Sequence, residues 1–234
     1  MPTDLEIIQQ LEQEIWPIGS LFGKKLKRIS LDAISGSHNG YAADKNNNII
    51  GLNLDKNNIS FIPSSLFYLK YLTKLSLFGN QIDKLPVSFG QLQNLRILWL
   101  NENQLKELPT SFGQLQKLSY LELQYNQLKE LPVSFGQLQN LEYLELQHNQ
   151  LRELPASFGQ LKNLRYVYIN SNKISRLPKE ILSLNLEPKW GDYQSMLGYG
   201  MAVKDNPLVS PPVEVIQRGQ QAVYNYFEQL KQGD

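Results

Sequence analysis

The sequence predicts an α/β solenoid, in which short parallel strands stack side by side into one continuous curved sheet. A unit of 23 residues recurs in strict register, and a period of this length is typical of repeat architectures. Each unit alternates apolar and polar residues as a short strand does, and a proline 14 residues after its start then ends the strand. The six regular units start at Ile49, Leu72, Leu95, Leu118, Leu141 and Leu164.

The apolar positions of a unit predict how it folds. Leu121 and Leu123 alternate with polar residues and indicate a strand. The S-F-G-Q-L stretch that follows the proline predicts a short helical or 3₁₀ return, which turns Phe135 and Leu138 inward. One unit buries too little apolar surface to offset the entropy lost on ordering it. We therefore expect the units to fold only as a stack that is capped at both ends.

An asparagine recurs eight residues after each start, where the chain has to bend away from its strand. The bend leaves backbone amides and carbonyls without ladder partners, and a buried carboxamide can satisfy both kinds of group. We therefore predict that these asparagines bridge adjacent turns and have a structural role. The regular units supply Asn57, Asn80, Asn103, Asn126, Asn149 and Asn172, and a weaker seventh unit supplies Asn206.

Residues 1–48 lack the repeat and predict an N-terminal cap. Thr3 and Glu6 have the spacing of a capping box, which predicts a helix over residues 4–16. Polar stretches on both sides of residues 41–44 predict a loop and a hairpin leading into the first repeat strand. We expect the apolar side of the helix to cover the open edge of that repeat. Its apolar run is Leu5, Ile8, Leu11 and Ile15.

The repeats extend over residues 49–212, but their period slips near the end. The insertion EPKWGDYQSML, residues 187–197, replaces the expected return. The pattern then resumes near Gly198 with a degenerate seventh unit. Residues 213–234 are amphipathic and predict a helical C-terminal cap, with Ser210 as its N-cap and Gly219 dividing it into two helices.

Composition narrows the function. Lys and Arg total 23 against 22 Asp and Glu, which gives no reason to expect a nucleic-acid partner. The chain has no cysteine, no signal segment at its start and no run long enough for a membrane helix, so we expect a cytoplasmic protein without a membrane anchor. Its two histidines, His38 and His148, lack the neighbours of a catalytic triad or a metal site. We expect no enzyme activity, no metal and no cofactor.

Strand residues that lie between the inward leucines should form the concave face. Because neighbouring strands lie about 4.8 Å apart, Tyr120, Tyr143 and Tyr166 should stack into a ladder, with glutamates beside the rings. Exposed aromatic residues are enriched in binding hot spots, so this face predicts a protein or peptide partner with apolar groups and a lysine or arginine. The predicted contact residues are Phe78, Ile97, Trp99, Glu102, Tyr120, Glu122, Tyr125, Tyr143, Glu145, His148, Tyr166 and Tyr168.

Other interpretations of this face stay open. Duplication of the units could have copied tyrosine and glutamate, in which case the rings stabilise the sheet alone. Flat rings beside carboxylates and amides also suit a glycan or another small ligand. Binding could instead involve the loop around Trp190 and Tyr193, or the C-terminal cap. The sequence leaves the oligomeric state open.

The repeats resemble a known family. L-x-x-L-x-L-x-x-N-x-L is the leucine-rich-repeat signature, and LPxxFGQLxNL units resemble those of bacterial intracellular leucine-rich-repeat proteins. The resemblance implies a horseshoe with a parallel concave sheet and about seven repeats. The tail KDNPLVSPPVEVIQRGQQAVYNYFEQL resembles the end of the repeat domain in bacterial Roco proteins, where a GTPase domain follows. This implies an alternative function as the regulatory repeat domain of a Roco-type GTPase. The GxxxxGK[ST] phosphate loop of a GTPase does not occur in the sequence, because Gly19–Lys25 is one residue too short.

Overall fold

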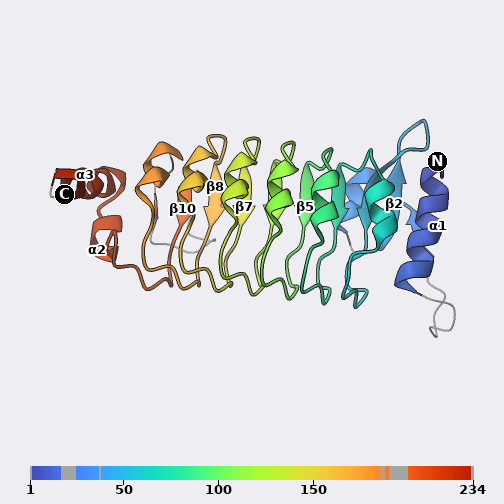
Figure 1. Ribbon diagram of the computed structural model, residues 1–234, viewed down its shortest axis with the longest axis horizontal. Helices are drawn as coiled ribbons and strands as arrows, with labels where there is room; N and C mark the ends of the chain where they lie inside the picture. Colours follow the sequence, from blue (N-terminus) through green and yellow to red (C-terminus); the bar gives the residue numbers. More distant parts are fainter. Residues whose placement is uncertain are drawn as a thin grey trace.

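The protein forms an elongated stack of repeats with a helix at each end (Figure 1). Helix α1 (Asp4–Ile15) lies at one end, and α2 (Val213–Ile216) and α3 (Gln220–Gln232) lie at the other. The predicted α/β solenoid with a parallel sheet is confirmed. This computed structural model describes residues 2–16, 25–36, 38–184, 186, 188–189 and 200–232.

The described strands form one sheet of ten strands in the order β1-β2-β3-β4-β5-β6-β7-β8-β10-β9. Neighbouring strands are parallel, except for β2 and β3, which form the antiparallel hairpin expected before the first repeat. Gly51 lies opposite Lys74 and Lys74 opposite Ile97, so equivalent residues of successive repeats are side by side. The strands are β1 (Lys27–Arg28), β2 (Gly40–Ala43), β3 (Ile49–Asn53), β4 (Lys74–Ser76), β5 (Ile97–Trp99), β6 (Tyr120–Glu122), β7 (Tyr143–Glu145), β8 (Tyr166–Tyr168), β9 (Pro188–Lys189) and β10 (Gly200–Ala202).

The returns are 3₁₀ helices, as the S-F-G-Q-L stretch predicts. In η3 to η6 a proline is the N-cap, and the phenylalanine two residues into the helix is fully buried. Phe112 and Phe135 stack with their ring centroids 6.2 Å apart, so the buried rings form a column along the solenoid. The 3₁₀ helices are η1 (Leu31–Ser35), η2 (Ser64–Tyr68), η3 (Val87–Gln91), η4 (Thr110–Gln114), η5 (Val133–Gln137), η6 (Ala156–Gln160) and η7 (Lys179–Leu184).

The glycine of each S-F-G-Q return allows the repeats to approach one another closely. A Cβ atom on Gly113 would lie 2.3 Å from the carbonyl oxygen of Ser134 in the next return. Gly136 has the same relation to Ser157, at 2.3 Å. Real Cβ atoms do not come this close to a backbone oxygen, so a larger residue would force adjacent repeats apart.

Asparagines tie each repeat to the one before it. Asn126 accepts a hydrogen bond from the backbone N–H of Leu105 at 2.9 Å, and its Nδ2 donates to the carbonyl oxygens of Leu100 at 2.9 Å and Leu123 at 3.0 Å. The same pattern occurs at the other asparagines of this column that follow another repeat. These are Asn80, Asn103, Asn149, Asn172 and Asn206.

Asn57 is the exception to the predicted bridging. Its Nδ2 donates to the carbonyl oxygen of Asp55 within its own turn, and its Oδ1 is buried without a hydrogen-bond partner among the described residues. The physical reason is its place in the first repeat, because the column has no earlier repeat whose backbone it could bridge. Asn57 instead donates its backbone N–H to Asn80 Oδ1 at 3.0 Å.

Two further sets of hydrogen bonds join the repeats on their outer side. Ser134 Oγ donates to the carbonyl oxygen of Thr110 at 2.6 Å, and Asn140 Nδ2 donates to that of Gln116 at 2.7 Å. Both donors reach back 24 residues, to the preceding repeat. Adjacent repeats are therefore connected at several points around each turn, and not by the sheet alone.

Helix α1 begins with the predicted capping box: Thr3 Oγ1 accepts from the N–H of Glu6, and the Glu6 carboxylate accepts from the N–H of Thr3. Its buried residues are Ile7, Ile8 and Leu11, which join the core. Leu5, which the apolar run assigns to the same side, is 43% exposed. The helix therefore packs through a face that includes Ile7 in place of Leu5.

The C-terminal repeat resumes where the sequence pattern places it. Strand β10 pairs directly with β8, with Met201 opposite Val167, and β9 then pairs on the far side of β10. No pattern in the sequence predicts this outer strand. The rest of the predicted insertion, Gly198 and the alternative binding loop at Trp190 and Tyr193 lie outside the described residues, as does most of Gly19–Lys25.

The C-terminal cap corrects one prediction. Gly219, with φ of 89°, separates α2 from α3 as expected. Ser210, however, is not the N-cap, because α2 begins after Pro212. Ser210 Oγ instead accepts a hydrogen bond from the hydroxyl of Tyr226 at 3.2 Å, which joins α3 to the last repeat.

Replacing Asn126 by alanine tests the bridging asparagines. Asn126→Ala leaves buried backbone groups of two repeats without partners, so we expect the free energy of unfolding to fall by about 1–3 kcal/mol. Chemical denaturation measures the change. Asn57→Ala is the matched control and should cost clearly less, because the side chain of Asn57 bonds only within its own turn. Equal losses in the two variants would contradict the bridging role.

The close approach at the returns gives a second stability prediction. Gly113→Ala places a methyl group against the Ser134 carbonyl, and we expect a loss of about 1–3 kcal/mol from overpacking. Gln116→Ala removes an exposed side chain from the same repeat and should change stability by less than about 0.5 kcal/mol. Thermal melting of both variants is the measurement, and a Gly113→Ala protein that melts like the wild type would refute the packing argument.

Candidate functional site

The candidate site is the sheet surface that points away from the buried core, here called the concave face. Alternation along each strand places every second side chain on it, and the parallel register aligns equivalent residues into columns. Most of the predicted contact residues lie in these columns, whereas Glu102, Tyr125 and His148 lie at the edge of the face, three residues after their strands end, and the residues differ in exposure. Tyr168 and Glu145 are buried, Glu102, Tyr125 and His148 are exposed, and the others are half-buried.

In the fourth repeat, a tyrosine, a glutamate and a glutamine form a hydrogen-bonded triad. The Tyr120 hydroxyl donates to Glu122 Oε1 at 2.6 Å, and Gln124 Nε2 donates to Glu122 Oε2 at 3.0 Å. Burial and the bond to Glu122 raise the pKa of Tyr120 far above its usual value, so the hydroxyl keeps its proton. Both carboxylate oxygens of Glu122 therefore already have a donor from the same repeat.

The fifth repeat carries the same triad with a more buried carboxylate. Tyr143 donates to Glu145 Oε1, and Gln147 Nε2 donates to Glu145 Oε2 at 2.7 Å. Only 7% of Glu145 is exposed, and burial raises the pKa of its carboxyl, which the nearby charge of Glu122 raises further. Glu145 is therefore buried and already accepts a hydrogen bond at each carboxylate oxygen, which weakens its predicted role as a direct contact.

Only two of the three rings of the predicted tyrosine ladder stack in parallel, and the third is tilted. Tyr120 and Tyr143 stack face to face, with centroids 4.4 Å apart and planes 2° from parallel. Tyr166 is tilted by 51° from Tyr143 at 5.9 Å. The physical reason is the change of residue at the glutamate column, where the sixth repeat has Tyr168. The Tyr168 ring packs against Tyr143 at 5.7 Å and occupies the space that a carboxylate fills in the earlier repeats.

Aromatic side chains continue toward the first repeats. Trp99 lies 6.1 Å from Tyr120 with a tilt of 56°, and Ile97 lies one residue before Leu98 on the same strand, with its side chain half-buried. The ammonium group of Lys56 lies over the ring of Phe78, at 4.7 Å from its centroid. This part of the face combines apolar rings with charged groups, as a contact surface for a peptide does.

A second aromatic pair lies at the edge of the face, where the strands end. Tyr125 and His148 stack at 4.4 Å with planes 10° apart, and Tyr125 is 52% exposed. Both have left-handed backbones, with φ of 57° and 55°, as does Glu102 with φ of 53°. This conformation costs energy for a bulky residue, yet the turn imposes it in each of these repeats. The left-handed conformation directs the rings of Tyr125 and His148 outward, beside Gln124 and Gln147.

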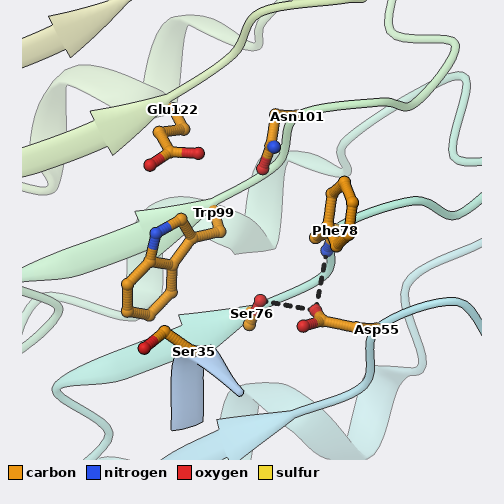
Figure 2. Close-up of a pocket in the computed structure, with 7 residues that line it drawn as sticks. All are labelled: Ser35, Asp55, Ser76, Phe78, Trp99, Asn101 and Glu122. Carbon is orange, nitrogen blue, oxygen red and sulfur yellow. Dashed lines mark hydrogen bonds between the residues drawn. The ribbon is translucent and has the colours of Figure 1, made fainter. Parts of the chain in front are cut away.

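Three hollows divide the concave face. The first has a volume of about 230 Å³ and lies in the first repeats (Figure 2). The second, about 360 Å³, lies along Tyr120, Tyr143 and Tyr166. The third, about 490 Å³, lies beside Tyr125 and His148. The lining residues of the first are Ser35, Asp55, Ser76, Phe78, Trp99, Asn101 and Glu122, and we call it the acidic–aromatic hollow.

The predicted contact residues omit part of this hollow. Asp55, Ser76 and Asn101 lie in strand columns of the same face, so their position is implied by the repeat register, but their chemistry was not recognised. Ser35 comes from η1, outside the repeats, and no pattern in the sequence could have placed it there. Within the described ranges, no group of three His, Asp or Glu side chains is arranged to hold a metal ion. No helix in the described part of the chain is long and apolar enough to cross a membrane.

Family models match the repeats. A leucine-rich-repeat model matches residues 47–105 and 85–128, and a leucine-rich-repeat region model matches residues 113–187. Together they extend from the first strand of the repeats to the start of the insertion. The chain is a leucine-rich-repeat protein.

Solved leucine-rich-repeat structures are similar to this chain. The ectodomain of the plant membrane receptor kinase GASSHO1/SCHENGEN3 from Arabidopsis thaliana, in complex with CASPARIAN STRIP INTEGRITY FACTOR 2, is 26% identical with a TM-score of 0.59. The match covers 74% of this chain and 23% of that one. A PEPR1–AtPEP1 structure is also 26% identical, with a TM-score of 0.61, and the match covers 72% of this chain and 23% of that one.

A leucine-rich-repeat protein of Leptospira interrogans is 35% identical, with a TM-score of 0.49, over 57% of this chain and 40% of its own. The leucine-rich-repeat chain described here therefore spans less than half the length of each of these three solved chains. No curated protein matches it.

The buried Glu145 predicts a dependence of stability on pH. Because its pKa is raised in the native state, the native protein takes up a proton before the unfolded chain does, and protonation stabilises the fold. Glu145→Gln removes this proton uptake. Glu102→Gln makes the same change of charge at an exposed position. The Glu102→Gln variant keeps Glu145 and its proton uptake. As the pH falls from about 7 to about 5, we therefore expect its free energy of unfolding to rise relative to that of the Glu145→Gln variant. Denaturant titrations at the two pH values measure the difference, and a difference that stays constant would show that Glu145 is not desolvated.

Proposed function

We propose that this leucine-rich-repeat protein is a non-catalytic interaction module that binds a protein or peptide on its concave face. The observation that carries the proposal is the density of rings on this face, where Trp99, Tyr120, Tyr143 and Tyr166 follow one another across four adjacent strands. Leucine-rich-repeat domains commonly bind proteins or peptides. The GASSHO1/SCHENGEN3 ectodomain, which shares the fold, is itself described in complex with CASPARIAN STRIP INTEGRITY FACTOR 2.

The triads define what the partner contacts. In the fourth and fifth repeats each carboxylate oxygen already accepts one hydrogen bond, from tyrosine or glutamine, so the tyrosine rings are the main surface offered to a partner there. The half-buried rings of Trp99 and Tyr166 lie at the two ends of this stretch. A partner with apolar side chains that lies across the strands fits the second hollow along the tyrosines.

The wider context of the module is also a proposal. The absence of cysteine favours a reducing compartment such as the cytoplasm. The resemblance of the tail to bacterial Roco proteins supports the alternative of a regulatory domain, and a gene product that continues beyond Asp234 into a nucleotide-binding domain would favour it. Binding of a glycan on the rings is the further alternative, which a glycan array tests.

Selection from a displayed library of random peptides tests binding. Peptides enriched on the wild type should lose at least about tenfold in affinity for a Trp99→Ala/Tyr166→Ala variant, because two anchor rings are removed. Titration calorimetry with the synthetic peptides gives the affinities, and thermal melting confirms that the variant is folded.

Tyr68→Ala/Tyr71→Ala is the matched control. These two tyrosines are 57% and 54% exposed and lie outside the concave-face columns, so their removal should leave the affinity unchanged. Enriched peptides that bind both variants as well as the wild type would move the site away from the concave face. A library that yields no binder would refute a peptide-binding function.

A further inference from the structure

The first three repeats depart from the later ones on the concave face. Trp99 occupies the column that holds glutamate in the fourth and fifth repeats, and Asp55 and Phe78 occupy the column that holds asparagine or glutamine in every later regular repeat. No other regular repeat has these residue types in those columns, so copying of a repeat does not account for them. They meet in the acidic–aromatic hollow (Figure 2).

The size of this hollow limits what it can hold. Its volume of about 230 Å³ is below the range of about 300–1,000 Å³ that is typical of small-molecule sites. Figure 2 shows Trp99 and Phe78 on either side of it, with Asp55 at one end and Glu122 and Asn101 at the other. A hollow of these dimensions fits one long side chain of a partner that continues across the face.

The carboxylate of Asp55 can accept a further hydrogen bond from a partner. Ser76 Oγ donates to it at 2.5 Å and the backbone N–H of Phe78 at 2.9 Å, and both bonds are made to Oδ1, as the dashed lines of Figure 2 show. Oδ2 takes part in neither bond. Burial raises the pKa of the Asp55 carboxyl because it removes water from the charged form. A cation beside the carboxylate would stabilise that charged form in place of the water.

The other lining groups also favour a cation with several donors. Asn101 Oδ1 is buried and has no hydrogen-bond partner among the described residues, and Glu122 adds a second negative charge. The ring faces of Trp99 and Phe78 attract cations through their electrons. The chain itself provides an example of this attraction, since Lys56 Nζ lies 4.7 Å from the centroid of Phe78.

We propose that the acidic–aromatic hollow receives an arginine side chain of the bound peptide, stacked on Trp99 and hydrogen-bonded to Asp55. This inference rests on the proposed function and specifies its partner. A guanidinium group fits better than an ammonium group because it is planar, stacks on rings, loses less hydration and presents five donors to acceptors in different directions. The partner is therefore a peptide with an arginine among apolar residues.

N-acetyl-arginine methylamide is the probe, and N-acetyl-citrulline methylamide is its uncharged counterpart of the same shape. The indole N–H signal of Trp99, assigned with a Trp99→Phe variant, reports binding in ¹H–¹⁵N spectra. We expect a saturable shift with the arginine compound, with a dissociation constant on the order of millimolar, and binding at least about tenfold weaker with citrulline.

Two variants distinguish binding in the hollow from a general attraction of the arginine compound to the charge of the surface. Asp55→Asn keeps an acceptor for Ser76 and Phe78 and should weaken binding of the arginine compound at least about tenfold. Glu107→Gln changes the charge equally at an exposed position outside the hollow and should have no effect. Equal binding of arginine and citrulline, equal loss in the two variants, or no shift of Trp99 would each overturn the inference.

Failure of the arginine assignment can be distinguished from failure of the proposed peptide-binding function. If the peptide library yields binders that need Trp99 and Tyr166 while the arginine compound does not shift Trp99, the concave face binds peptides and the arginine assignment is wrong. If the library yields no binder, the proposed function fails as well. Enrichment of arginine in the selected peptides, lost when selection is repeated on Asp55→Asn, would support both.

Discussion

The rest of the structure depends on how each repeat satisfies the backbone groups of its neighbour. The chain bends sharply after every strand, and the buried asparagine at that bend accepts from an amide of the preceding repeat and donates to carbonyls of both repeats. These groups would otherwise be buried without partners. The bonds also set the spacing at which the phenylalanine rings stack and the return glycines meet the next carbonyl. A repeat of this kind is stable only against another repeat, and the ends therefore need caps.

The same spacing creates the concave face on which binding is proposed. Because the register advances by one whole repeat at each strand, a residue type that recurs in the sequence becomes a continuous column on the sheet. Repetition alone yields the paired triads of the fourth and fifth repeats, in which tyrosine and glutamine each donate a hydrogen bond to the glutamate of their own repeat. Distinctive chemistry arises where the columns are interrupted. The hollow around Trp99 is such a place, since most of its lining comes from the first three repeats, which lack the triad, and only Glu122 comes from a repeat that has it.

Much of the fold was predictable because the period is regular. The strands, the 3₁₀ returns, the columns and the positions of the bridging asparagines all follow from one repeated unit. The predictions were wrong where a residue lacks a regular neighbour. Asn57 has no earlier repeat to bridge, Tyr166 meets Tyr168 in place of a carboxylate, and Leu5 is exposed while Ile7 is buried. Strand β9 lies outside β10, an order that no periodic pattern contains. The hollow depends on Ser35 from the N-terminal cap, and only the three-dimensional packing of η1 brings it to the face.

The proposed binding surface is the concave face with the acidic–aromatic hollow. A crystal structure of the protein with a peptide selected from the library tests it most directly. We expect a peptide that lies across strands β4 to β8, with an arginine side chain between Asp55 and Trp99 and apolar side chains on the tyrosines. A peptide bound to the outer returns or to helices α2 and α3, with the hollow left empty, would contradict it.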